Sequence, residues 1–428
     1  MIDRELLRQV LLEQAEFTVP ADFILREIIP TLTPLMSLPS IVIIMGVRRC
    51  GKSTLLHWVR LQSAEKDYYI NFDDDRLVDF SLADFQTLYE LMIEMWGKQT
   101  TFFFDEIQLI PEWERFVRRL HDHGNKIYIT GSNAIMFSSE LGTRLTGRYL
   151  SVTMFPYGFK EYIQYKSPDL GPYQPTSEIT ANYRRLFTEF LTEGGFPEYV
   201  KYLAPDYLHT LFENIVYKDI IVRYKLPHER IIRSLLHFLA SNIAKNITFN
   251  ALRKPLGLSN SNTVAEYCHY FQNSFLCFMI NKYSPSLKQQ YGYAKKIYWI
   301  DLALAQKIGF RISEDRGRML ENAVYLELLR RGKEIYFYQE KKECDFIIKF
   351  EHRIIAAIQV TVSLNDPKTR EREIAGLIEA LKAFGLTQGI IITENENDTI
   401  TYEEEGQLFS IIVMPIWRWL IEPHLQNA

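Results

Sequence analysis

Apolar residues in the first third of the chain occur in short runs, and the segments between these runs have apolar positions at helical spacing. The runs cover residues 41–45, 68–72, 100–104 and 126–130. Short apolar runs that alternate with helices are typical of a mostly parallel sheet covered by helices on both faces. We therefore predict an α/β fold over residues 38–155, with its ligand at the carboxyl ends of the strands.

The pattern is helical from residue 180 to 227, with a break at Gly194-Gly195-Phe196-Pro197. Beyond it, three helices are predicted over residues 231–243, 249–256 and 259–275. Two strand-like runs follow, separated by a basic and aromatic stretch, residues 282–295. Three helices followed by such a hairpin are typical of a winged helix.

The last part of the chain alternates again. A helix is predicted over 316–331 and another over 370–384, with strands at 334–338, 343–348, 354–362 and 389–393. This order resembles the PD-(D/E)xK nuclease fold. We therefore predict five regions: an N-terminal helical segment (1–37), a parallel-sheet core (38–165), a helical lid (166–227), a winged-helix-like domain (228–312) and an α/β restriction-endonuclease-like domain (313–428).

Composition narrows the class of protein. The chain has 428 residues, of which 47% are hydrophobic and 14% aromatic, so it can form several buried cores. Its net charge of -4 gives no general indication of nucleic-acid binding. The four scattered cysteines favour a reducing compartment over a disulfide framework or a zinc site. The charged N-terminus and the lack of long apolar runs predict a cytoplasmic protein without a membrane span.

A phosphate-binding loop follows the first apolar run. Residues 46–53 read Gly-Val-Arg-Arg-Cys-Gly-Lys-Ser, which is the P-loop pattern between a strand and a helix. The two glycines allow the backbone to wrap a phosphate, and the N–H groups at the start of the helix face the anion. We expect ATP to bind to Gly46, Val47, Arg48, Arg49, Cys50, Gly51, Lys52, Ser53 and Thr54.

Two acids end the third run, at Asp105 and Glu106. In a P-loop protein, a carboxylate at this place holds Mg²⁺ and the next acid polarises the attacking water. We assign Mg²⁺ to the Ser53 hydroxyl and Asp105, and the catalytic base to Glu106. By itself, an Asp-Glu pair after an apolar strand would indicate only a solvated strand end.

Polar residues after the fourth run give further candidates. Asn133, with Ser132 second, could reach the terminal phosphate or the attacking water, although Gly-Ser-Asn is also a common turn. Arg148, with Arg144 second, is a candidate arginine finger that would act on a phosphoryl group in its own or a neighbouring subunit. A surface ion pair is an equally good interpretation of these arginines.

Several motifs together resemble a known family. They are Gly-x-Arg-Arg-x-Gly-Lys-Ser, Phe-Asp-Glu-Ile-Gln (104–108), Thr-Gly-Ser-Asn (130–133), Leu-x-Gly-Arg (145–148), Phe-Pro-Tyr-Gly-Phe-Lys-Glu-Tyr (155–162) and Glu-Gly-Gly-Phe-Pro-Glu-Tyr (193–199). The chain is similar over nearly its whole length to the predicted AAA-type ATPases of bacteria and archaea with an uncharacterised C-terminal domain. The resemblance implies nucleotide hydrolysis and leaves the biological role open.

The nuclease-like region lacks key residues. Active PD-(D/E)xK enzymes place an acid and then Glu-x-Lys on adjacent strands, to hold metal and activate water. Asp345 matches the acid, but the second motif reads Gln359-Val360-Thr361. We therefore expect no nuclease activity, and a structural or vestigial role for Glu321 and Asp345.

These observations predict a Mg²⁺-dependent ATPase in which hydrolysis changes the relation between core, lid and C-terminal region, with DNA as a candidate partner. The alternative is a nucleotide-gated protein-interaction switch without DNA contact. An ATP-dependent nuclease is a third and weaker interpretation. The third helix of the winged-helix-like region has no lysine or arginine between residues 259 and 269, which disfavours contact with phosphates. Partners could also include further copies of the chain or an unidentified protein.

Overall fold

The computed structural model describes residues 2–16, 19–133, 145, 147–310, 315–404 and 406–422. The chain forms two compact units, one of residues 1–156 with 273–275 and one of residues 157–272 with 276–428. The first unit contains the predicted N-terminal segment and most of the predicted core. The predicted boundaries at 37, 165, 227 and 312 remain predictions.

The first unit is built on a five-stranded parallel sheet in the order β2-β3-β4-β1-β5. Its strands are β1 (Ile41–Met45), β2 (Tyr69–Asn71), β3 (Thr101–Asp105), β4 (Lys126–Gly131) and β5 (Tyr149–Thr153). The apolar runs were long enough to predict the first four strands within about two residues, because each is buried on both faces. The predicted α/β fold is confirmed.

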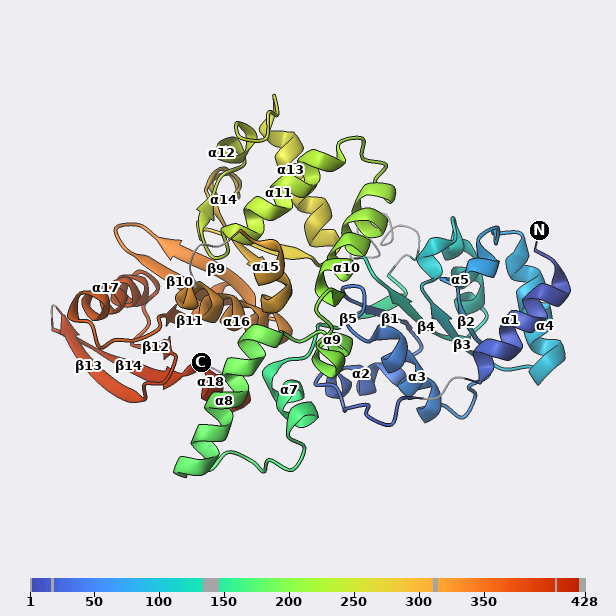
Figure 1. The fold of residues 1–428 in the computed structure, drawn as a ribbon, viewed down its shortest axis with the longest axis horizontal. Coiled ribbons are helices and arrows are strands. Elements are labelled where there is room, and N and C mark those ends of the chain that lie inside the picture. The colour runs from blue at the N-terminus through green and yellow to red at the C-terminus, as the bar shows by residue number, and fades with distance from the viewer. Residues whose placement is uncertain are drawn as a thin grey trace. The chain divides into compact units, whose positions relative to one another are not determined.

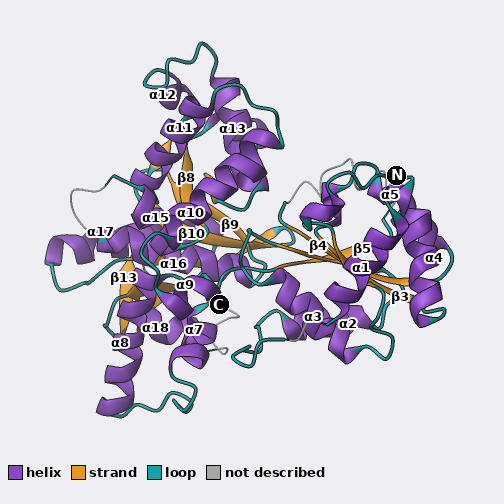
Figure 2. Ribbon diagram, turned by 45° about the vertical axis from the view of Figure 1, so that its right-hand side comes forward, coloured by secondary structure: helices purple, strands orange, loops and turns teal. Residues whose placement is uncertain are grey.

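Helices cover both faces of this sheet. Figure 1 and Figure 2 show α3 (Lys52–Gln62) and α5 (Trp113–Asp122) on opposite faces. At the β2 edge of the sheet, α1 (Arg4–Ala15) packs on β2 and on α4 (Asp84–Trp96). At the opposite edge, α2 (Ile29–Met36) packs on β5. Short 3-10 turns follow β2 (η1, Asp75–Leu77) and β3 (η2, Ile107–Leu109).

The second unit begins with helices. They are α7 (Phe159–Lys166), α8 (Ser177–Glu193), α9 (Pro197–Tyr202) and α10 (Tyr207–Asn214), which continues into a π-helical segment, η4 (Ile215–Val222). The break predicted at residues 194–197 separates α8 from α9. Gly195 lies there against the backbone of Tyr157, whose N–H donates to the Gly195 carbonyl at 2.6 Å.

The middle of the second unit has the predicted order of elements. It contains α11 (Glu229–Ser241), α12 (Phe249–Arg253), α13 (Ser261–Asn273) and an antiparallel sheet in the order β6-β8-β7, made of β6 (Asn246–Ile247), β7 (Cys277–Asn281) and β8 (Lys295–Trp299). A short helix, α14 (Leu287–Gly292), lies within the predicted hairpin, and α15 (Leu302–Ile308) follows it. Identification of this segment as a winged helix remains a prediction.

A mixed six-stranded sheet forms the C-terminal part, in the order β13-β14-β12-β11-β10-β9. Helix α16 (Arg316–Arg330) precedes β9 (Glu334–Gln339), β10 (Glu343–Phe350) and β11 (Arg353–Val360), and α17 (Pro367–Phe384) leads to β12 (Gln388–Thr393). This order is the predicted one. Three further elements were not predicted from the sequence, namely β13 (Asp398–Glu404), β14 (Gln407–Pro415) and α18 (Ile416–Ile421). Helix α17 packs on β10, β11 and β12 and closes the core.

Candidate nucleotide site

The predicted nucleotide residues meet at the carboxyl edge of the first sheet. The P-loop follows β1, the two acids end β3, and β4 lies between these two strands. In register, Met45 is beside Gly131, so the residues after β4 continue along the same edge as the P-loop. The buried side chains of Ser132 and Asn133 follow directly, between the loop and Asp105 in strand order. The order of the strands, rather than any single contact, therefore brings the predicted nucleotide residues together.

The conformation of the P-loop requires glycine at two positions. Gly46 has φ +152°, and a Cβ there would lie 1.9 Å from the Met154 carbonyl oxygen at the end of β5. Gly51 has φ +103° and begins α3. Any side chain at Gly46 would force the loop away from β5. The loop therefore packs directly on the strand beside it.

Lys52 and Glu106 face each other. Lys52 is 4% exposed, its Nζ donates to the Val47 carbonyl at 3.1 Å, and the same Nζ lies 3.7 Å from Glu106 Oε1. Glu106 has φ +52° and accepts a hydrogen bond from the Gln108 amide. The Lys52 ammonium, from the P-loop after β1, and the Glu106 carboxylate, from the residue after β3, are thus close together at the place where a phosphate would be bound.

Asp105 is fully buried and held by several hydroxyls. Thr130 Oγ1 donates to Asp105 Oδ1, the Tyr69 hydroxyl donates to Oδ2 at 3.3 Å, and Ser53 also hydrogen-bonds to this carboxylate. Burial raises the pKa of Asp105 to about 6, with the neighbouring Glu106 carboxylate adding to the rise. The Ser53 hydroxyl and the Asp105 carboxylate form an oxygen donor pair that suits Mg²⁺.

The sequence did not identify three residues that shape this site. Thr130 joins both acids, because its Oγ1 also accepts from the Glu106 N–H at 3.0 Å. Tyr69 is the second hydroxyl on Asp105. Arg26, 5% exposed, donates to the Cys50 carbonyl at 2.9 Å and to the Phe155 carbonyl at 2.6 Å. The position of Thr130 near the end of a strand was an available signal, whereas nothing local in the sequence marked Arg26.

Arg148 lies away from the P-loop. Its carbonyl accepts from the N–H of Ile41 at the start of β1, whereas the P-loop follows the other end of that strand. The Arg148 guanidinium is paired with Asp122 at 3.0 Å. The structure therefore does not support an arginine finger acting within its own subunit. Arg144, the second candidate, lies outside the described residues.

Other predicted site residues have more ordinary surroundings. Arg48 lies 3.7 Å from Asp73, and the neighbouring Asp74 caps η1 and pairs with Arg76, so these acids are part of a local ion-pair network. Cys50 is buried, and burial raises the pKa of its thiol. Among the residues that the structure describes, no group of three or more His, Cys, Asp or Glu is arranged to hold a metal ion. No helix in the described ranges is long and apolar enough to cross a bilayer.

Comparison with known proteins agrees with this geometry. Residues 39–163 match the model of a family described as an AAA domain. Residues 184–315 and 316–419 match two domains of unknown function, DUF8612 and DUF4143.

Two relatives extend over most of the chain. An uncharacterised protein of Methanocaldococcus jannaschii is 33% identical over 98% of this chain and 96% of its own length. An uncharacterised protein of Haemophilus influenzae is 30% identical over 89% of this chain and 94% of its own length.

Among solved structures, the Aeropyrum pernix ORC1 protein in complex with DNA is 12% identical, covering 72% of this chain and 96% of that one, with a TM-score of 0.33. Cdc6p from Pyrobaculum aerophilum is 14% identical, covering 72% and 98%, with a TM-score of 0.25. TM-scores this low carry no argument about function. From the family model and the full-length relatives, the chain belongs to the AAA-type P-loop ATPases that carry an uncharacterised C-terminal domain.

Proposed function

We propose that the protein is a Mg²⁺-dependent ATPase whose hydrolysis drives a rearrangement of its domains. The observation that carries this proposal is the convergence of Lys52, Ser53, Asp105 and Glu106 at one edge of the sheet. Nucleotide binding follows from family membership and from the glycine-lined loop. Hydrolysis follows from the second acid, because a site that only binds nucleotide has no need of a base beside the metal-binding carboxylate.

The roles of the side chains follow from their positions. Residues 46–54 would hold the phosphates, with Lys52 as a point charge between the last two. Ser53 and Asp105 would hold Mg²⁺, which supplies charge neutralisation at the phosphates when it is bound. Glu106 would orient and deprotonate the attacking water, and Asn133 would hydrogen-bond to that water or to the terminal phosphate.

The contact between Lys52 and Glu106 suggests how binding and hydrolysis are linked. Lys52 Nζ donates to the Val47 carbonyl and lies 3.7 Å from Glu106 Oε1. A triphosphate would attract Lys52 more strongly than a single carboxylate does. Glu106 would then lose a neighbouring cation and become the stronger base. In this proposal, the base is active only when the phosphates are in place.

The partner of the hydrolysis cycle is either DNA or a protein. We retain DNA as the first candidate because of the predicted winged helix. Two observations favour the alternative, a protein-directed switch. Helix α13 contains no lysine or arginine, and Lys282 at the start of the predicted wing is paired with Glu340 at 2.9 Å. These features reduce the basic surface on which phosphate contact depends. Self-association also remains part of the proposal, since Arg148 could act only on another copy.

The test is steady-state ATP hydrolysis by the wild type and two variants. Lys52→Ala should abolish productive ATP binding. Glu106→Gln should bind ATP and lose turnover by about 10²–10⁴-fold, the usual contribution of a general base. Glu112→Gln is the matched control, because Glu112 is an exposed acid a few residues beyond the same strand. Wild-type turnover in Glu106→Gln would reject the assignment of the base.

The same assay with duplex DNA separates the two candidate partners. Stimulation of the wild type, lost as salt is raised, would support coupling to DNA. If DNA neither binds at low salt nor changes the rate, the protein-directed switch is the better description. Capture of partners with the ATP-trapped Glu106→Gln variant is then the next experiment.

A further inference from the structure

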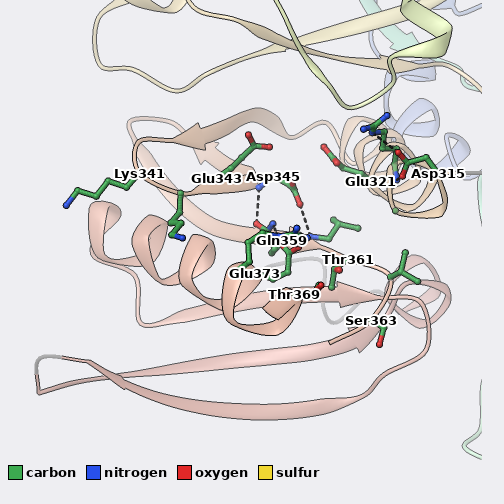
Figure 3. A pocket seen from close by; sticks show the side chains of 16 residues that line it. Asp315, Glu321, Lys341, Glu343, Asp345, Gln359, Thr361, Ser363, Thr369 and Glu373 are labelled. Atoms are coloured by element: carbon green, nitrogen blue, oxygen red, sulfur yellow. Dashed lines mark hydrogen bonds and ion pairs between the residues drawn. The ribbon is translucent and has the colours of Figure 1, made fainter. Parts of the chain in front are cut away.

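A second group of charged residues lies far from the nucleotide residues in the chain. A pocket of about 880 Å³ opens in the C-terminal part of the second unit, between α16, β10, β11 and α17. Figure 3 shows Glu321, Glu343 and Asp345 gathered on one side of it, above Gln359 and Glu373. Several carboxylates at such short range repel one another unless a cation lies among them.

That cation is a lysine of the chain itself. Lys296 comes from β8, and its side chain is 2% exposed. Its Nζ lies 2.9 Å from Glu321, 2.7 Å from Glu343 and 2.9 Å from Asp345. An ammonium group has three N–H donors, so the three carboxylates use all of them. Burial alone would lower the pKa of Lys296, but the carboxylates raise it well above its ordinary value, so the group is charged.

Asp345 and Glu321 also accept hydrogen bonds from other groups of the chain. Asp345 Oδ2 accepts from the Val360 N–H at 3.0 Å, and Glu321 Oε1 also accepts from the Tyr298 hydroxyl at 2.7 Å. Gln359 accepts from the Asp345 N–H at 3.2 Å and donates to Glu373 at 2.5 Å. A divalent ion at this place would have to displace Lys296 from a buried position where three carboxylates stabilise its charge.

We infer that the Lys296 ammonium occupies the position of a divalent cation in this carboxylate cluster, and that the cluster binds no metal ion while the lysine is in place. The cluster then serves to join β8 to α16 and β10. Removal of the lysine should leave a vacant cation site formed by Glu321, Glu343 and Asp345. This inference is independent of the proposed ATPase, because none of its residues belongs to the nucleotide site.

Other contacts support a joining role. The Trp299 N–H donates to Asn322 Oδ1 at 2.7 Å, and Asn322 Nδ2 donates to the Trp299 carbonyl at 3.0 Å. The Tyr283 N–H donates to the Phe337 carbonyl at 2.8 Å. Strand β8 is therefore bonded to α16 through Trp299 and Asn322, and the segment after β7 is bonded to β9. We call these contacts, together with those of Lys296, the seam.

Mn²⁺ is a suitable probe, measured by electron paramagnetic resonance on the full chain. The Asp105→Asn background removes the carboxylate of the other candidate metal site, where Ser53 would be left as the second ligand. In that background the lysine-containing chain should bind no stoichiometric Mn²⁺, and its Tm should not change with Mn²⁺. Adding Lys296→Met should lower Tm by several degrees and create binding of one Mn²⁺ per chain, with Tm partly restored by the metal. Adding Asp345→Asn to this variant should abolish both effects.

Two results would overturn the inference. One is stoichiometric Mn²⁺ binding by the lysine-containing chain that is lost on Asp345→Asn, which would make the cluster an ordinary metal site. The other is the absence of Mn²⁺ binding and of metal rescue when the lysine is removed. If Lys296→Met does not fold, Lys296→Gln removes the positive charge, keeps two N–H donors for the carboxylates and leaves all three carboxylates in place, and the same two criteria apply.

Discussion

At the scale of single residues, the two acids after β3 depend on one hydroxyl group of the neighbouring strand. Thr130 donates to Asp105 and accepts from the Glu106 N–H, so it fixes these two acidic residues relative to each other. It is fully buried, so no water can replace its hydroxyl without rearrangement. We regard Thr130 as a positioning residue, because it acts through Asp105 and Glu106.

Thr130→Val should reduce kcat by about 10–100-fold, because a hydrogen bond to a charged group contributes about 1.5–3 kcal/mol. ATP binding should change little, since no P-loop contact is lost. The measurement is kcat and KM for ATP at saturating Mg²⁺. Thr130→Ser keeps the hydroxyl and serves as the control. A loss of activity shared by both variants would indicate a packing effect instead.

At the scale of elements, the segment before α2 supports the P-loop through Arg26. Its guanidinium joins a carbonyl in the loop to a carbonyl just beyond β5, and it lies where a side chain on Gly51 would meet it at 3.3 Å. The segment thus holds the loop in place and brings a positive charge close to it. The sequence had identified residues 1–37 only as a helical segment.

Arg26→Met should weaken ATP binding by about tenfold, because the loop loses two hydrogen bonds and a nearby positive charge. The measurement is the Kd of a fluorescent ATP analogue. Arg8→Met is a matched control, because Arg8 lies in the same N-terminal segment but is paired with Glu94 at the surface. Equal affinities for the ATP analogue in the two variants would show that Arg26 does not contribute to nucleotide binding.

The elements also show what could be predicted from the sequence. Strands β1, β3 and β4 were predictable because each is an uninterrupted apolar run, and the P-loop and Asp105-Glu106 followed from their places at strand ends. The strand order was not predictable. Arg148 directly precedes β5, which runs parallel to β1, so Arg148 lies at the opposite edge of the sheet from its own P-loop. β13 was not identified, since its side chains alternate in exposure without an apolar run. Lys296 was predicted only as part of a strand. Its ion pairs were not predictable, because the sequence does not show which carboxylates surround it.

At the scale of the molecule, the two groups of interacting charges discussed above differ in design. In the first unit, the Lys52 ammonium lies 3.7 Å from a single carboxylate, that of Glu106. In the second unit, the buried Lys296 ammonium lies within 2.9 Å of three carboxylates. The seam around Asn322 and Lys296 makes the three-stranded and six-stranded sheets parts of one folding unit, in agreement with the single compact unit that contains both.

Asn322→Ala should lower the free energy of unfolding of the second unit by about 2–4 kcal/mol, because it leaves the buried N–H and carbonyl of Trp299 unpaired. Chemical denaturation followed by tryptophan fluorescence would measure the change. Asn395→Ala, at an exposed position, is the control and should be within about 0.5 kcal/mol of the wild type. A similarly small effect of Asn322→Ala would show that the seam is not required for stability.

The seam also limits how the gene can be divided. The two domains of unknown function meet between residues 315 and 316, yet that border separates Lys296 and Trp299 from Glu321 and Asn322. A polypeptide ending at 315 would retain a buried ammonium without its counter-charges, and one starting at 316 would retain the counter-charges alone. We therefore expect that neither polypeptide folds stably when it is expressed alone, and that neither is inherited as a separate domain. The two regions are therefore expected to be gained, lost and exchanged together during evolution.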